Sequence, residues 1–144
     1  MTTPVTDNPF QLHPVGRVES PLLARGDAPR QGDEGAPPAW LVFDPSVAEA
    51  LRDLREGADV LVLTWLDRAD RTVLAVHPRG EADRPVTGVF ATRSPDRPNP
   101  IGLHRVTIET IEDGGLRMRV RDLEALDGTP VLDIKPVLGA TDER

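Results

Sequence analysis

Alternation of apolar and polar positions is clearest in the last third of the chain. Residues 116–120 place Leu, Met and Val on one side and arginines on the other, which predicts a strand with one face in a core. Residues 104–111 alternate in the same way, with Val106 and Ile108 inward. The Asp-Gly-Gly run between the two segments is typical of a hairpin turn.

Residues 60–66 are almost wholly apolar and rich in β-branched side chains, which predicts a strand buried on both faces. In residues 131–135 we expect Leu132 and Ile134 to form the apolar side. Four other short segments are also predicted to be strands: residues 15–19, 41–43, 72–77 and 88–92.

One helix is predicted. Asp44 is suited to cap its first turn and Pro45 to occupy its first position. Val47, Leu51 and Leu54 fall on one face, and Gly57 is suited to end the helix after about three turns.

About seven strands and one helix, without βαβ alternation or a GxGxxG turn, predict a mostly β protein. We expect a small antiparallel or mixed β-barrel rather than a Rossmann fold. The 144 residues fit one domain, which we place at residues 10–140 after a flexible segment at residues 1–9. Residues 25–38 form a long loop rich in Gly and Pro, and loops of that length are often functional.

Composition excludes several classes of site. The chain has no cysteine and only three histidines, none spaced as metal ligands, so we expect no metal. No apolar run approaches the roughly 20 residues of a membrane span, and the first residues do not resemble a secretory signal. We therefore expect a cytoplasmic protein. The net charge of −7 opposes a surface that attracts nucleic acid throughout, but a local basic patch remains compatible with it.

Residues 88–103, GVFATRSPDRPNPIGL, hold the strongest candidate site. The three prolines make this loop stiff. Arg93 and Arg97 carry guanidinium groups suited to bind a planar or anionic group. The alternative is a proline-rich surface turn with solvated arginines.

This stretch resembles the signature of the TrmO (TsaA-like) family. Two further stretches resemble that family: LDGTPVLDIKP at residues 126–136, and HPVGRVESP at residues 13–21 followed by APRQG at residues 28–32. The resemblance implies a small β-barrel that binds S-adenosylmethionine and forms homodimers. It also implies N6-methylation of threonylcarbamoyladenosine at position 37 of tRNA. Longer members carry an extra C-terminal segment that helps with tRNA, and we expect this chain, which ends at Arg144, to lack it.

The resemblance also implies which residues bind the cofactor. They are Pro29, Arg30, Gln31, Arg93, Leu103, Asp122, Leu123 and Glu124. Carboxylates suit this role because ribose hydroxyls and an ammonium group need acceptors. The alternative for Asp122 and Glu124 is a solvated strand end.

The chain departs from the family in two places. Asp67 and Arg68 stand where members often carry His-Gln, so their contact with the cofactor is an open question. His104 replaces a serine; it is either a strand histidine without a role or a group that assists proton removal. Asn99 is a second catalytic candidate, because its side-chain oxygen could hold the amino group of an adenine.

Arg97 and Lys135 are candidates for binding the methyl acceptor, although Lys135 could instead pair with Asp133 on the same strand face. The three arginines of residues 117–121 form either a solvated face or a ribbon for phosphates. Two other functions stay open: methylation of a small molecule, and cofactor binding without turnover.

Overall fold

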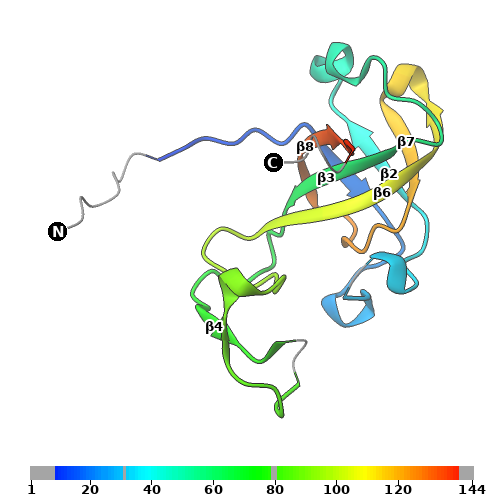
Figure 1. The fold of residues 1–144 in the computed structure, drawn as a ribbon. Coiled ribbons are helices and arrows are strands. Elements are labelled where there is room, and N and C mark those ends of the chain that lie inside the picture. The colour runs from blue at the N-terminus through cyan, green and yellow to red at the C-terminus, as the bar shows by residue number, and fades with distance from the viewer. Residues whose placement is uncertain (1–8, 31, 79–80, 140–144) are drawn as a thin grey trace.

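The computed structural model describes residues 9–30, 32–78 and 81–139. Six strands form a closed barrel in the order β1-β2-β7-β6-β3-β8, and every neighbouring pair is antiparallel (Figure 1). The strands are β1 (Gly16–Glu19), β2 (Ala39–Phe43), β3 (Asp59–Trp65), β6 (Ile101–Glu112), β7 (Arg117–Arg121) and β8 (Pro130–Pro136). The predicted mostly β barrel is therefore confirmed. Residues 1–8 of the predicted flexible segment lie outside the described residues.

Pairing of β1 with β8 closes the barrel. Gly16 is opposite Val131 and Arg17 is opposite Pro130, and the Val15 amide donates to the Val131 carbonyl at 2.8 Å. Strand β6 pairs with β3 along one edge and with β7 along the other, so it holds the two halves of the barrel together.

The barrel core confirms the predicted alternation in β6 and β7: Val106, Ile108, Met118 and Val120 are all buried. Strand β3 differs from the prediction, because only one of its faces is fully buried while the other is half-buried. In β8 a register shift opposite Leu63 and Thr64 brings Val131 into the core. The two residues predicted to form the apolar side of β8 are only half-buried.

The predicted helix is present but shorter, as the 3-10 helix η3 (Pro45–Leu51). The Asp44 carboxylate accepts from the Ser46 amide at 2.9 Å, which confirms the cap and lowers the pKa of Asp44. The predicted end at Gly57 is wrong. The chain leaves the helix after Leu51, and the Gly57 amide donates to the Ile108 carbonyl at 2.7 Å instead. Contact with β6 therefore overrides the local helical preference.

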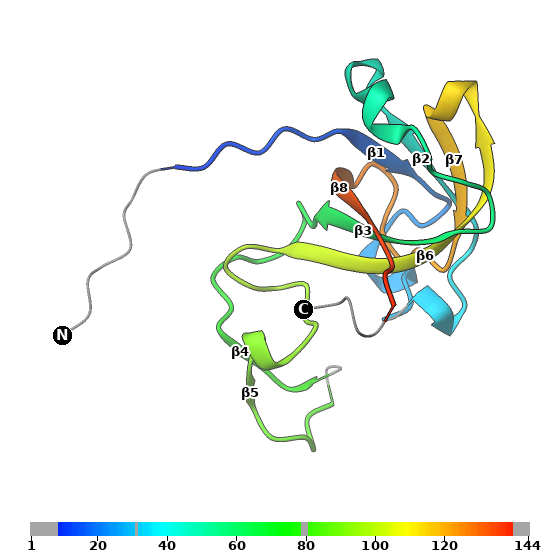
Figure 2. The ribbon, with the colours of Figure 1, turned by 45° about the horizontal axis from the view of Figure 1, so that its top comes forward.

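An arm projects from the barrel between β3 and β6 (Figure 2). It contains a small ladder of β4 (Ala75–Val76) with β5 (Thr87–Gly88), followed by the 3-10 turn η5 (Val89–Ala91). The strands predicted at residues 72–77 and 88–92 are therefore mostly wrong. Leu74 is 69% exposed and Phe90 83% exposed, so the arm buries too little apolar surface to sustain longer strands.

Candidate functional site

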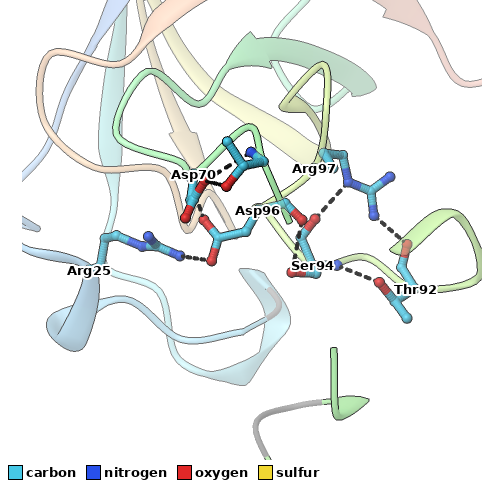
Figure 3. A network of polar contacts seen from close by, with 7 residues as sticks. Arg25, Asp70, Thr92, Ser94, Asp96 and Arg97 are labelled. Carbon is cyan, nitrogen blue, oxygen red and sulfur yellow. Dashed lines mark hydrogen bonds and ion pairs between the residues drawn. The ribbon is translucent and has the colours of Figure 1, made fainter. Parts of the chain in front are cut away.

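Three loops meet beside the barrel. Arg25, in the turn η1 (Arg25–Asp27), forms an ion pair of 3.1 Å with Asp96 of the proline-rich loop. The other carboxylate oxygen of Asp96 accepts from the Asp70 amide at 2.8 Å (Figure 3). Arg68 donates to the Leu23 carbonyl at 2.6 Å. The long N-terminal loop, the loop after β3 and the proline-rich loop are thus tied into one unit.

Asp96 is the centre of this unit. Partial burial on its own raises the pKa of the Asp96 carboxyl, but hydrogen bonds from the Arg25 guanidinium and the Asp70 amide outweigh it. The pKa therefore lies below its ordinary value, and the carboxylate is charged at neutral pH. The sequence pattern did not single out Asp96, because neither of its partners is close in the chain.

Arg71 fixes the end of the proline-rich loop. Its guanidinium donates to the Pro98 carbonyl at 2.7 Å and to the Asn99 side-chain oxygen at 3.0 Å. It also stacks over the Trp65 ring at 5.2 Å. The Asn99 side-chain oxygen is predicted to hold the amino group of an adenine. Because it already accepts from Arg71, only its remaining lone pair is available for that contact.

Arg97 is engaged within its own loop. The guanidinium donates to the carbonyls of Ser94 at 2.7 Å, Val89 at 2.8 Å and Thr92 at 2.6 Å. Figure 3 shows this side chain reaching back over the loop. Arg93 is exposed on the same loop. The structure therefore gives Arg97 the task of shaping the loop and leaves Arg93 accessible to a ligand.

We expect Arg97→Lys to loosen the proline-rich loop without unfolding the barrel. A lysine ammonium cannot reproduce the planar fork that reaches the three carbonyls. Amide hydrogen exchange of residues 89–97 should quicken at least about tenfold. Arg84→Lys is the matched control, because Arg84 lies on the same arm and its guanidinium pairs with the exposed carboxylate of Glu81. Unchanged exchange in the Arg97 variant would contradict the role of this clamp.

Across the site, the N-terminal loop packs on the segment between β7 and β8. A β-carbon at Gly32 would stand 1.6 Å from the Asp122 carbonyl oxygen and 2.9 Å from a carboxylate oxygen of Glu124. Only glycine allows this approach. Asp122 itself has a left-handed backbone, with φ of 68°. Gly32 directly follows the predicted cofactor residues of the N-terminal loop, and Asp122 begins another predicted cofactor segment; the structure brings these two positions into contact.

A depression of about 300 Å³ opens at this junction. It is lined by Gly32, Asp33, Leu103, His104, Asp122 and Glu124, together with Asp59 and Arg105 at the far side. Hydrogen bonds from the Thr107 hydroxyl and the Arg105 guanidinium lower the pKa of Asp59. A larger surface hollow of about 590 Å³ lies beside Trp40; residues of the 13–21 and 126–136 motifs line it, but none of the predicted cofactor residues does. We place the site at the smaller depression because candidate residues from several segments meet there.

The remaining cofactor candidates differ in accessibility. Pro29 is half-buried and Arg30 exposed, on the loop that leads into Gly32, while Gln31 lies outside the described residues. Leu103 is 44% exposed at the edge of the depression. The Leu123 side chain is fully buried in the barrel core, so only its backbone could contact a ligand.

Lys135 and the arginines of β7, the remaining charged candidates, lie on outer faces of the barrel. Lys135 pairs with Asp133 at 3.4 Å, and both side chains are more than half exposed. On β7, Arg117 pairs with Glu19 at 3.3 Å and Arg119 pairs with Glu109 at 3.7 Å. Carboxylates therefore offset much of the positive charge on this face.

In the described part of the chain, no helix is long and apolar enough to cross a membrane. The same residues contain no cluster of three or more His, Asp or Glu side chains that could hold a metal ion.

The fold and the site define a class: small closed antiparallel barrels whose candidate ligand site lies where two loop segments meet strand β6. Residues 17–143 match the N-terminal domain of tRNA-methyltransferase O. The chain belongs to this family.

Similar proteins include two archaeal relatives. A "Probable S-adenosyl-L-methionine-binding protein" of Methanothermobacter thermautotrophicus is 44% identical over 92% of this chain and 93% of its own length. An "S-adenosyl-L-methionine-binding protein" of Archaeoglobus fulgidus is 44% identical over 86% of each chain. A crystal structure of TrmO from Pseudomonas aeruginosa superposes with a TM-score of 0.72 at 31% identity, over 94% of this chain. This chain spans only 59% of the length of that TrmO structure.

Proposed function

We propose that the protein is an S-adenosylmethionine-dependent methyltransferase. The observation that carries the proposal is the contact of Gly32 with Asp122 and Glu124 at the depression; Gly32 belongs to the N-terminal loop that Arg25 ties to the proline-rich loop. Relatives named as binding S-adenosylmethionine support the same cofactor.

The residues around the depression fit this cofactor. The carboxylates of Asp122 and Glu124 offer acceptors for ribose hydroxyls or for the ammonium of the methionine part. Arg30 and Arg93 do not line the depression, but both are exposed and offer donors for its carboxylate. The exposed apolar Leu103 is suited to contact the adenine.

When bound, S-adenosylmethionine supplies a methyl group that its sulfonium already activates for displacement. The chain then has to orient the acceptor in line with the carbon–sulfur bond and to exclude water. A rigid proline-rich loop held by Arg71 and Arg97 is suited to that positioning.

We propose N6 of threonylcarbamoyladenosine in tRNA as the methyl acceptor. The proposal draws its support from the family, which is named for a tRNA methyltransferase. Calorimetric titration with S-adenosylmethionine tests the cofactor, and transfer of labelled methyl to tRNA with and without this nucleoside tests the acceptor. Label in the modified tRNA alone is the expected result. Absence of binding would overturn the cofactor, and binding without any transfer would indicate a cofactor-binding module.

A small-molecule acceptor is the second candidate, because carboxylates pair with the β7 arginines that would otherwise attract phosphates. The salt dependence of tRNA binding separates the two acceptors. Binding through phosphate contacts weakens steeply as salt rises. Tight binding of tRNA with that dependence supports a tRNA enzyme, whereas no measurable binding supports a small acceptor.

We also propose a homodimer. Ile101 and Leu103 of β6 lie opposite Trp65 and Leu63 of β3 on the outer face of the barrel, and both β6 side chains are 44% exposed. The arm adds Phe90, which is 83% exposed. Exposed apolar side chains of this kind commonly mark an interface, and a second copy would cover the same residues on both chains.

Phe90→Lys should therefore weaken the dimer at least about tenfold, because aromatic anchors carry much of the energy of an interface. Light scattering over a dilution series measures the dissociation constant. Phe10→Lys is the matched control, since Phe10 is 91% exposed but lies on the N-terminal segment before the barrel. A wild-type protein that is monomeric at all concentrations would contradict the proposed homodimer.

A further inference from the structure

One end of the barrel interior is polar. Thr64 of β3 is fully buried and His104 of β6 is 5% exposed, although the buried core of the barrel is otherwise apolar. The Thr64 hydroxyl lies 2.7 Å from His104 Nε2. His104 Nδ1 lies 2.6 Å from Glu124 Oε1, and Glu124 is in the segment after β7. Thr64, His104 and Glu124 form a continuous polar chain from the barrel interior to the rim of the depression.

The chemistry of the three groups places the protons. A carboxylate can only accept, so the Nδ1 atom beside it has to carry a hydrogen. In a neutral imidazole the other nitrogen is then an acceptor, and the Thr64 hydroxyl is the donor that faces it. Glu124 thus selects the tautomer in which His104 Nδ1 donates, and the Thr64 hydroxyl holds the other ring nitrogen, an assignment that follows from the hydrogen-bond network.

Close packing holds the imidazole in place. A β-carbon at Gly102 would stand 2.3 Å from the Thr64 hydroxyl and 2.6 Å from His104 Nε2. The absence of a side chain at that position is what gives the two groups room. Both ring nitrogens are occupied and the ring is buried, an arrangement that favours positioning over direct proton transfer from an acceptor.

The other oxygen of Glu124 faces the N-terminal loop. It would lie 2.9 Å from a β-carbon at Gly32, and Glu124 lines the depression. We propose that His104, held by Thr64, is a positioning residue that fixes one oxygen of Glu124 so that the other accepts from a hydroxyl or ammonium of the cofactor. The inference rests on the proposed function and assigns a role to His104.

Calorimetric titration with S-adenosylmethionine tests the proposal with two pairs of variants. Thr64→Val keeps the shape and removes the hydroxyl, whereas Thr64→Ser keeps the hydroxyl. His104→Leu removes the donor to Glu124, whereas the amide of His104→Asn can replace Nδ1–H. We expect the first member of each pair to bind at least about tenfold more weakly than the second. Thermal unfolding checks that all four variants are folded.

Thr129→Val is the control for loss of a buried hydroxyl. Thr129 is as buried as His104, and its hydroxyl donates to the Leu126 carbonyl rather than to the polar chain. This variant should lose stability without losing affinity for S-adenosylmethionine. An equal loss of affinity in Thr129→Val and Thr64→Val would show a general structural effect and overturn the positioning role.

Nitrogen NMR of the imidazole gives a readout that is independent of the cofactor. The chain has three histidines, so His104 is assigned by the signal missing in His104→Asn. We expect the Nδ1–H tautomer in the wild type; the Nε2–H tautomer would place the proton on Glu124 and overturn the proposal. Unchanged affinity in both Thr64→Val and His104→Leu would overturn this inference alone. A wild type that binds no S-adenosylmethionine would overturn the proposed function together with it.

Discussion

Gly32→Ala should weaken S-adenosylmethionine binding by about tenfold to 100-fold while the barrel stays folded. The added β-carbon would stand 1.6 Å from the Asp122 carbonyl oxygen, which is backbone and cannot rotate away. The N-terminal loop would therefore have to move off the segment that carries Asp122 and Glu124. Calorimetric titration measures the affinity, and circular dichroism measures the folded barrel.

Gly26→Ala is the matched control for this loop. Gly26 lies in the turn η1, and a β-carbon there would meet no atom within 4 Å. Its affinity should equal that of the wild type. If Gly32→Ala also bound normally, the contact between the two segments would not shape the site, and the proposed location of the cofactor would have to be abandoned.

Gly102→Ala should lower the free energy of unfolding by about 1–3 kcal/mol, the usual cost of overpacking a core. The new methyl group would meet the Thr64 hydroxyl at 2.3 Å and His104 Nε2 at 2.6 Å. Neither neighbour can easily move, since Thr64 is fully buried and β-branched and His104 is held at both ring nitrogens. Denaturant unfolding of the wild type and the variant measures the difference.

The control is Gly88→Ala, in which the new methyl group would meet nothing within 4 Å. It should leave the free energy of unfolding within about 0.5 kcal/mol of the wild type. A Gly102 variant as stable as the Gly88 variant would show that the barrel end relaxes easily, against the rigid polar chain described above.

Strands β6 and β7 could be predicted from the sequence because each buries one face, and burial leaves an alternating pattern, as in residues 116–120. Strand β3 is apolar on both faces, so the sequence did not reveal that one of them is only half-buried. The helix and the arm could not be placed as well. Local propensity predicts a helix up to Gly57, but the observed helix ends at Leu51 and the Gly57 amide donates to the Ile108 carbonyl of β6 instead. In the arm, apolar residues such as Phe90 suggested a strand, yet they are exposed in the isolated chain.

In the candidate site, too, the motifs could be predicted from the sequence, but the contacts between distant loops could not. Motif resemblance identified segments such as the one containing Glu124, and the structure brings it against the N-terminal loop. It did not reveal the role of Asp96 or Arg71, whose partners lie on other loops. Nor did it indicate that Arg97, a candidate for binding the acceptor, would donate to carbonyls of its own loop, because the residue type alone does not distinguish the two tasks.

Because the strands β1 and β8 close the barrel, it cannot close during synthesis until both have been made. While a ribosome is still extending the chain, β1 has its β2 neighbour but its other edge stays open until residues 130–136 emerge. Strand β3 likewise waits for β8 along one side. The nascent protein therefore carries two unpaired strand edges late into synthesis, the condition in which β proteins are most prone to aggregate.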